Sequence, residues 1–285
     1  MGKERFPVGG RLRDGTLKAL LYAFLVAYAF VCLYPFFLMV VSSLKSTGEI
    51  FQSPFGLPES PSLHAYRMAW ETGNFREYFL NSVLVTASSV ALILFAGSMA
   101  AYPIGRHDFR GRGFLYLYFL GGLMLPIKLG VVPLFFLMTS LGLYDTRLSL
   151  VLVYAASGMP FAVFVLSAFF RTLPRELEEA ARVDGAGEFR IYWQIMLPLV
   201  RPALATVAIF NFIQLWNDFF FPLVLIQTDG LRTLPAGLAN FFGTYQNDWA
   251  LIFAGLTITS LPLIVLYLFA SKQIVRGLTA GATKG

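Results

Sequence analysis

Six long stretches of hydrophobic residues run along the chain, separated by shorter segments that hold nearly all of its charges. A membrane-spanning helix needs about 20 predominantly apolar residues. The stretches that reach this length are residues 19–41, 78–105, 114–144, 148–170, 202–228 and 251–271. None of them shows the two-residue alternation of a barrel strand, so a membrane β-barrel is excluded. A single segment in lipid must then satisfy its backbone hydrogen bonds internally, and a helix does this. The pattern therefore predicts an all-α, polytopic membrane protein with six transmembrane helices.

The composition excludes other classes of protein. Of the 285 residues, 57% are hydrophobic and 13% are charged, and the mean hydropathy is +0.66, whereas soluble domains average roughly a quarter charged residues. An ordinary soluble enzyme and a disordered chain are excluded, and a single cysteine excludes a disulfide scaffold. The first apolar stretch is longer than the core of a signal peptide, so we expect an uncleaved first helix.

The basic residues predict the orientation in the membrane. If the N-terminus lies inside, sixteen lysines and arginines fall in inner segments and five in outer ones. Positive charge favours the cytoplasmic side. We therefore expect a cytoplasmic N-terminus at 1–18, a six-span transmembrane domain at 19–271 and a cytoplasmic tail at 272–285. An outer loop at 45–77, rich in Ser, Pro and Glu, is expected to form short helices.

The inner loop at 171–202 has the pattern of two short helices joined by a turn. Gly185 suits a helix end in the left-handed region. Helical spacing predicts two faces, one before and one after this glycine: Leu177, Ala180, Ala181 and Asp184, then Phe189, Tyr192, Trp193 and Met196. Periodicity alone leaves two interpretations open, a well-folded connector or a docking surface for a partner.

The residues of this loop resemble a known signature. Glu179-Ala180-Ala181, followed by Gly185, Ile195 and Leu197-Pro198 at the signature's spacing, is similar to the loop of importer permeases in the ATP-binding-cassette (ABC) superfamily. The segment from Leu173 to Ala186, the Trp216-Asn217-Asp218 triplet and the C-terminal tail resemble the carbohydrate uptake family, in particular its maltose-type second permease.

This resemblance implies an ABC importer permease fold and a set of partners. The chain would form half of a sugar pore with a second homologous permease, two ATPase subunits and an extracytoplasmic sugar-binding protein, in the inner membrane of a prokaryote. ATP and Mg²⁺ would bind to the ATPase, leaving no cofactor on this chain. The residues implied to couple to the ATPase are Glu179, Ala180, Ala181, Asp184, Gly185, Ala186, Leu197 and Pro198. Those implied to contact it from the tail are Leu278, Thr279 and Lys284.

Two charges inside predicted spans are further candidates. Lys128 and Asp218 lie at similar depths, and intramembrane charges usually face a cavity or a partner. Three interpretations stay open: separate placement at the outer interface, an ion pair, or contact with substrate. The other pore candidates are Asn211, Gln214, Trp216 and Asn217. Prolines and glycines also predict helix breaks around Lys128 and at Gly158-Met159-Pro160.

Catalysis on this chain is not expected. No phosphate-binding loop is present, and the two histidines, His64 and His107, are predicted on opposite sides of the membrane, which disfavours a metal site. The alternative function is a stand-alone, ion-driven secondary transporter that uses Asp218 as its ion site. The absence of an evident repeat and the complete signature loop weigh against it.

Overall fold

A computed structural model describes residues 9–244 and 248–282 of the chain. In these ranges every regular element is helical and no strand occurs. The chain divides into two compact units, one of residues 1–69 and 245–257 and the other of residues 70–244 and 258–285. The expectation of an all-α chain is confirmed.

The smaller unit holds the first apolar helix and most of the predicted outer loop. Its elements are α1 (Gly9–Ser43), α2 (Thr47–Gln52), most of α3 (His64–Glu71) and the first residues of α14 (Trp249–Ala282). The hydroxyl of Thr47 donates to Asp248 at 2.9 Å, and Phe51 packs edge-on against Trp249. The predicted short helices of the outer loop are thus present as α2 and α3.

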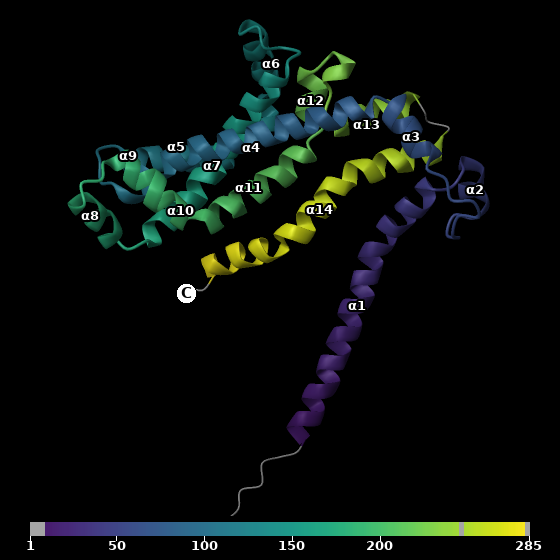
Figure 1. Cartoon of the computed structure of the whole chain (residues 1–285), viewed down its shortest axis with the longest axis horizontal. Coiled ribbons are helices and arrows are strands. Elements are labelled where there is room, and N and C mark those ends of the chain that lie inside the picture. Colours follow the sequence, from purple (N-terminus) through teal and green to yellow (C-terminus); the bar gives the residue numbers. More distant parts are fainter. Residues whose placement is uncertain (1–8, 245–247, 283–285) are drawn as a thin grey trace, which may run out of the picture. The chain divides into compact units, whose positions relative to one another are not determined.

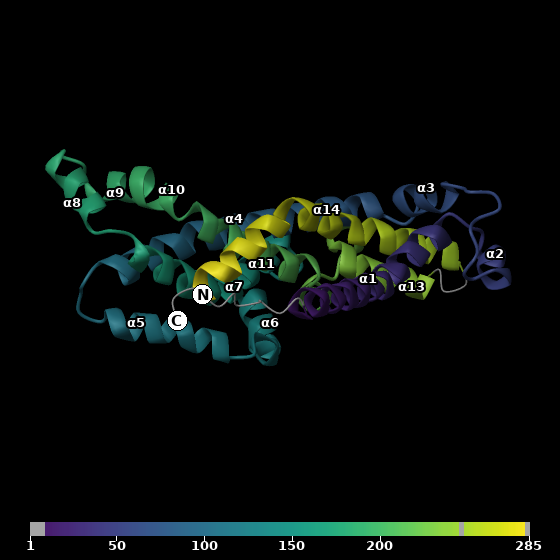
Figure 2. The ribbon, with the colours of Figure 1, turned by 90° about the horizontal axis from the view of Figure 1, so that it is seen from below.

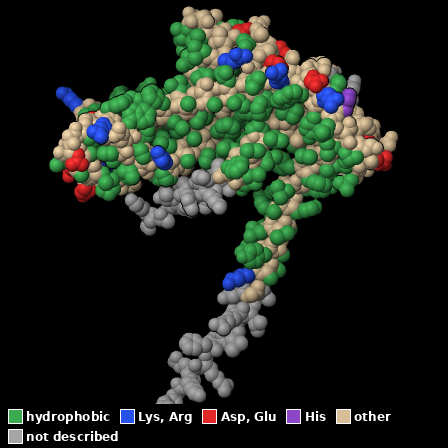
Figure 3. Space-filling model, in the orientation of Figure 1, with side chains coloured by type: hydrophobic (Ala, Val, Ile, Leu, Met, Phe, Trp, Pro, Cys, Tyr) green, Lys and Arg blue, Asp and Glu red, His purple; other side chains and the backbone are tan. Residues whose placement is uncertain are grey.

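The larger unit is a helix bundle with a pair of short helical limbs, residues 176–199, at one end (Figure 1). Its elements in chain order are α4 (Phe75–Arg106), α5 (Arg112–Met124), η1 (Ile127–Gly130), α6 (Val131–Ser140), α7 (Arg147–Thr172), α8 (Glu176–Val183), α9 (Glu188–Ile191), η2 (Tyr192–Met196), α10 (Leu197–Leu199), α11 (Arg201–Trp216), α12 (Phe220–Leu225), η3 (Asp229–Leu231), α13 (Leu234–Thr244) and the remainder of α14. Helix α4 packs along α7, and α11 packs against both. Hydrophobic side chains cover most of the bundle surface visible in Figure 3.

Four helices are long and apolar enough to cross a membrane, and two bent helix pairs raise the number of candidate spans to six within the described residues. The four helical segments are Leu17–Ser43, Phe75–Arg106, Arg147–Thr172 and Trp249–Phe269. The pair Arg112–Met124 with Ile127–Ser140 bends by 85°, and the pair Glu188–Leu199 with Arg201–Trp216 bends by 73°. The count agrees with the six apolar stretches of the sequence, but the second bent pair begins before the predicted stretch 202–228 and ends at Trp216.

Small residues bring α4, α7 and α11 close together. A Cβ atom at Gly97 would lie 2.8 Å from the Cβ of Ala162, and one at Gly158 would lie 2.4 Å from the side chains of Asn211 and Ile93. Membrane helices use such positions because lipid supplies no hydrophobic force between them, so close packing must hold them together. The bundle core is therefore built on contacts that a larger side chain at either glycine would obstruct.

One of the two predicted helix breaks is confirmed and the other is wrong. The break before Lys128 is present, since Leu125 is extended and Pro126 separates α5 from η1. The break expected at Gly158-Met159-Pro160 is absent, because α7 continues from Arg147 to Thr172 through Pro160. The missing side chain of Gly158 leaves space for Asn211 and Ile93, and Pro160 lies against Gly122.

Candidate functional site

The predicted helix–turn–helix of the inner loop is present, and we call residues 176–199 the elbow. Helix α8 forms its first limb, and α9, η2 and α10 form the second. Gly185 has φ of +80°, as its position at a left-handed turn requires. The amide of Ala186 donates to the carbonyl of Ala181 at 2.9 Å and closes the end of α8. Figure 2 shows the elbow projecting from the bundle.

The signature residues divide between an exposed and a buried side of the elbow. Glu179, Ala180, Asp184 and Gly185 are exposed, whereas Ala181 is buried in the core of the unit. The spacing of Leu177, Ala180, Ala181 and Asp184 predicted one common face. This prediction is wrong for Ala181, which is buried while the other three are exposed. The reason is that Ala181 lies three residues after the buried Glu178, which orients that side of α8 towards α4.

Glu178 forms a buried ion pair that the sequence analysis missed. Its Oε2 atom accepts hydrogen bonds from Arg106, at 3.0 Å from Nε and 2.7 Å from Nη2, and its Oε1 atom accepts one from the Tyr102 hydroxyl at 2.9 Å. The two charged side chains are only 3% and 6% exposed. Burial alone would raise the pKa of Glu178, but the hydrogen bonds from Arg106 and Tyr102 outweigh it and leave the pKa below its usual value. Breaking a buried pair of this kind typically costs about 3–5 kcal/mol.

Arg106 also binds the chain that leads into the elbow. Its Nη1 atom donates to the carbonyls of Leu173 at 2.6 Å and Phe170 at 3.3 Å, and Nη2 donates to that of Pro174 at 3.2 Å. The sequence offered one indication of this role, since Arg106 is a charge at the end of a long apolar stretch. In the sequence analysis it served only to orient the chain.

The second limb packs against α4 with part of its predicted aromatic stripe. Tyr192 and Met196 are buried, and the Tyr192 hydroxyl forms a 2.7 Å hydrogen bond with Ser98. Phe189 is 67% exposed and Trp193 is 38% exposed, so the face predicted for these four residues is buried only at Tyr192 and Met196. Residues 192–196 form a π-helix, which changes the side-chain register relative to an α-helix.

The remaining coupling candidates are partly buried or lie at the C-terminal end of the chain. Leu197, Pro198 and Ala186 are half-buried, and the limb bends by 73° into α11 after Pro198. Leu278 and Thr279 lie in α14, but their side chains are outside the described residues, as is Lys284 altogether.

Lys128 and Asp218 form an ion pair. Lys128 Nζ lies 3.8 Å from Asp218 Oδ1, with side-chain exposures of 63% and 11%. Asp218 Oδ2 accepts hydrogen bonds from the Tyr154 hydroxyl at 2.8 Å and from the amide of Phe221 at 3.1 Å. Lys128 lies in η1 and Asp218 in the turn between α11 and α12, so the pair joins two interruptions of helical structure. Among the three open interpretations, the structure shows the ion pair.

The other pore candidates do not form one polar surface. Asn211 is buried and donates to the carbonyl of Val207 at 2.9 Å, and Trp216 is 1% exposed and donates to the carbonyl of Thr259 at 3.1 Å. Gln214 and Asn217 are exposed, but Asn217 donates to the carbonyl of Ile213 in its own helix. Asn211, Gln214 and Asn217 follow one another at intervals of three, whereas Trp216 lies on a different side of the helix.

Asp145 joins the turn before α7 to the segment after α12 and was not a candidate in the sequence. Its Oδ1 atom accepts hydrogen bonds from the amides of Gln227 at 2.8 Å and Thr228 at 2.9 Å, and its Oδ2 atom accepts one from the Thr228 hydroxyl at 2.6 Å. These bonds from Thr228 and Gln227 lower the pKa of Asp145. The positive φ of Asp145, +58°, is compatible with its residue type, since aspartate tolerates the left-handed region.

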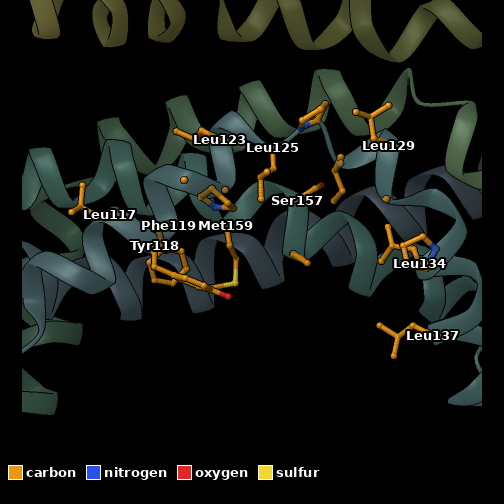
Figure 4. Close-up of a pocket in the computed structure, with 18 residues that line it drawn as sticks. Leu117, Tyr118, Phe119, Leu123, Leu125, Leu129, Leu134, Leu137, Ser157 and Met159 are labelled. Carbon is orange, nitrogen blue, oxygen red and sulfur yellow. The ribbon is translucent and has the colours of Figure 1, made fainter.

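A large hollow lies along the bent pair α5–α6 and the middle of α7 (Figure 4). Its volume is about 1300 Å³, and its lining is mainly apolar, including Leu123, Leu129 and Met159. A sugar needs polar groups for its hydroxyls, so this lining suits a hydrophobic surface better than a sugar. Within the described residues no cluster of three His, Cys, Asp or Glu side chains could hold a metal ion.

Comparison with known proteins identifies the family. Residues 93–279 match the family described as binding-protein-dependent transport system inner membrane component. The diacetylchitobiose uptake system permease protein NgcG of Streptomyces coelicolor is 39% identical over 270 residues, which cover 94% of this chain and 89% of that protein. The melibiose/raffinose/stachyose import permease protein MelC of Bacillus subtilis is 32% identical, over 96% of this chain and all of its own length.

Solved structures agree with the fold. A chain of a bacterial ABC transporter that imports the acidic polysaccharide alginate matches with a TM-score of 0.79 and 25% identity, over 95% of this chain and 99% of that one. A family model over residues 93–279, relatives along nearly the whole chain and a solved structure therefore agree with one another. The chain belongs to the inner-membrane permease family of binding-protein-dependent transport systems and is an integral inner-membrane transport subunit, with ATP hydrolysis carried by a separate subunit.

Proposed function

We propose that this chain is one permease subunit of an ABC importer for a sugar, an oligosaccharide or a related glycoside. Sequence relatives along nearly the whole chain carry names that refer to diacetylchitobiose and to melibiose, raffinose and stachyose, and the similar structure belongs to an alginate importer. These substrates differ in size and charge but are all carbohydrates. The elbow with its complete signature is the observation that carries the proposal.

The elbow supplies the surface for the ATPase. Leu177, Val183 and Phe189 expose 38%, 88% and 67% of their surface, beside the exposed carboxylate of Glu179. Exposed apolar groups next to a charge are typical of a partner interface. ATP and Mg²⁺ act on that ATPase, and the tail residues Leu278, Thr279 and Lys284 extend the contact with it.

A second permease completes the pore. The hollow of Figure 4 is apolar and open along α5, η1 and α6, and the polar pore candidates on α11 do not converge within this chain. A complete path for a polar sugar therefore requires groups from another subunit. A sugar-binding protein on the outer side delivers the substrate to this assembly.

The composition of the complex is the first test. The tagged chain is purified from native membranes in mild detergent, and co-purified proteins are identified by mass spectrometry. We expect an ATPase with a phosphate loop, a second polytopic permease and a binding protein. If the chain purifies without partners and catalyses ion-driven sugar uptake in liposomes, the proposal is contradicted and the stand-alone transporter is supported instead.

Transport by the purified complex in proteoliposomes tests the elbow. Gly185→Ala places a side chain at φ of +80°, which costs about 1–2 kcal/mol, although nothing lies within 4 Å of the new Cβ atom. We expect ATP-driven uptake of diacetylchitobiose or raffinose to fall at least threefold. Gly187→Ala is the matched control, because Gly187 has φ of −72° and equally open surroundings. Equal uptake by the two variants would show that the turn at Gly185 has no part in coupling.

A further inference from the structure

Three residues on one face of α4 contact both limbs of the elbow. Ser98, Tyr102 and Arg106 follow one another at intervals of four, which aligns them along the helix. Ser98 bonds to Tyr192 of the second limb, whereas Tyr102 and Arg106 bond to Glu178 of the first. We call these five residues the latch.

The latch also contacts the end of α7. Arg106 donates to the carbonyls of Phe170 and Leu173, and the Tyr102 ring packs edge-on against that of Phe170 with centroids 5.4 Å apart. Carbonyls at the C-terminal end of a helix lack partners within the helix, and here a guanidinium supplies part of the missing bonding. Arg106 thereby joins three elements, α4, α7 and α8.

The linker between α7 and α8 cannot act as a free hinge in this arrangement. The linker residues Leu173 and Pro174 both have their carbonyls bound by Arg106. The Arg106–Glu178 pair is buried, so water cannot readily replace either partner and the geometry is kept. A force on α8 is therefore carried to α4 and α7 through side chains as well as through the backbone.

We propose that the latch is the positioning device that converts movement of the elbow into movement of α4 and α7. The proposal rests on the function proposed above. When the ATPase displaces the elbow, the latch makes α4 and the end of α7 follow as one body. Without it, the elbow turns about residues 173–175, and ATP is hydrolysed without transport.

The ratio of ATP hydrolysed to sugar transported measures this coupling. Glu178→Gln removes the charge that holds Arg106, and Glu176→Gln is the matched control, since Glu176 is an exposed glutamate of the same helix. In proteoliposomes supplied with diacetylchitobiose or raffinose, we expect the ratio to rise at least fivefold for Glu178→Gln and to stay at the wild-type value for Glu176→Gln. A purely structural role would lower the amount of assembled complex and leave the ratio unchanged, which would overturn the proposal.

A second measurement is independent of the sugar. Spin labels are placed at Glu176→Cys on α8 and Leu84→Cys on α4, both exposed, after Cys32→Ser removes the single native cysteine. Leu84 lies about 33 Å along α4 from Arg106, which suits pulsed EPR of the complex in nanodiscs. We expect a narrow distance distribution with and without Mg-ATP, and a broad one after Glu178→Gln.

These outcomes separate the latch from the proposed function. An unchanged distance distribution in Glu178→Gln overturns the latch even if the wild-type complex imports sugar. Absence of sugar uptake by the wild type refutes the proposed function. The widths of the EPR distance distributions then still test whether the latch holds the elbow to α4. If Glu178→Gln does not assemble, Tyr102→Phe removes one hydrogen bond to Glu178 and is judged by the same two criteria.

Discussion

At the scale of single residues, the intramembrane pair is asymmetric. Asp218 has three partners and an 11% exposed side chain, whereas Lys128 is 63% exposed and its nitrogen is 3.8 Å from the carboxylate. An exposed ion pair at this separation contributes little to the stability of the fold, whereas the hydrogen bonds to a largely buried carboxylate contribute more. Asp218 therefore organises the turn before α12, and Lys128 is the freer member of the pair.

This asymmetry predicts different costs for removing each charge. Lys128→Leu should destabilise the purified protein by less than about 1 kcal/mol. Asp218→Leu should cost about 1–3 kcal/mol, because the buried hydroxyl of Tyr154 loses its acceptor. The measurement is unfolding in detergent, followed by tryptophan fluorescence. Equal losses of stability in the two variants would contradict the asymmetry and indicate that the charge pair itself dominates.

At the scale of elements, the same residue type has opposite effects in two helices. Pro126 ends a helix, and the chain bends by 85° there, while Pro160 lies within the continuous helix α7. The difference lies in their neighbours: Leu125 is extended before Pro126, whereas α7 is enclosed by α4, α5 and α11 around Pro160. Packing on several sides holds a helix together at a proline, because neighbouring helices restrain the chain.

Two glycines test how tightly these helices are packed. In Gly158→Ala the new methyl group would lie 2.4 Å from the side-chain ends of Asn211 and Ile93, so these two buried side chains must shift, at a cost of about 1–3 kcal/mol. Gly121→Ala in α5 meets nothing within 4 Å and should stabilise by about 0.5–1 kcal/mol through helix propensity. Opposite shifts of the unfolding midpoint are expected in detergent. Shifts of the same sign would show that the side chains of Asn211 and Ile93 rearrange around the new methyl group without a loss of stability.

At the scale of the whole molecule, charge predicts which side of the membrane each loop occupies. The sixteen-to-five distribution of basic residues predicts that both termini and the elbow lie in the cytoplasm and that residues 45–77 lie outside. The proposed contact between the elbow and an ATPase requires this orientation, since ATP is cytoplasmic.

Cysteine labelling in cells tests this topology. In the Cys32→Ser background, Leu57→Cys in the predicted outer loop and Arg110→Cys between the predicted second and third spans each provide one exposed thiol. A membrane-impermeant maleimide should label Leu57→Cys in intact spheroplasts and Arg110→Cys only after permeabilisation. The reverse pattern would invert the topology and rule out the elbow as the ATPase contact.

The sequence by itself determined the features that depend on neighbouring residues. The six candidate spans follow from the length of the predominantly apolar stretches, and the turn at Gly185 follows from the one residue type that adopts φ of +80° without strain. The elbow was predictable for the same reason, because its helical spacing and its signature lie within thirty residues of chain.

Only the tertiary structure decided which distant groups meet. Arg106 and Glu178 are 72 positions apart, and Tyr154 and Asp218 are 64 apart. Local pattern supplies no information on such pairs, since a charge near a span end suits either solvent or a buried partner. Whether Ala181 is exposed or Pro160 breaks α7 likewise depends on the surface packed against it. The final placement of these residues follows from the cost of burying a polar group or a void, which only the assembled helices define.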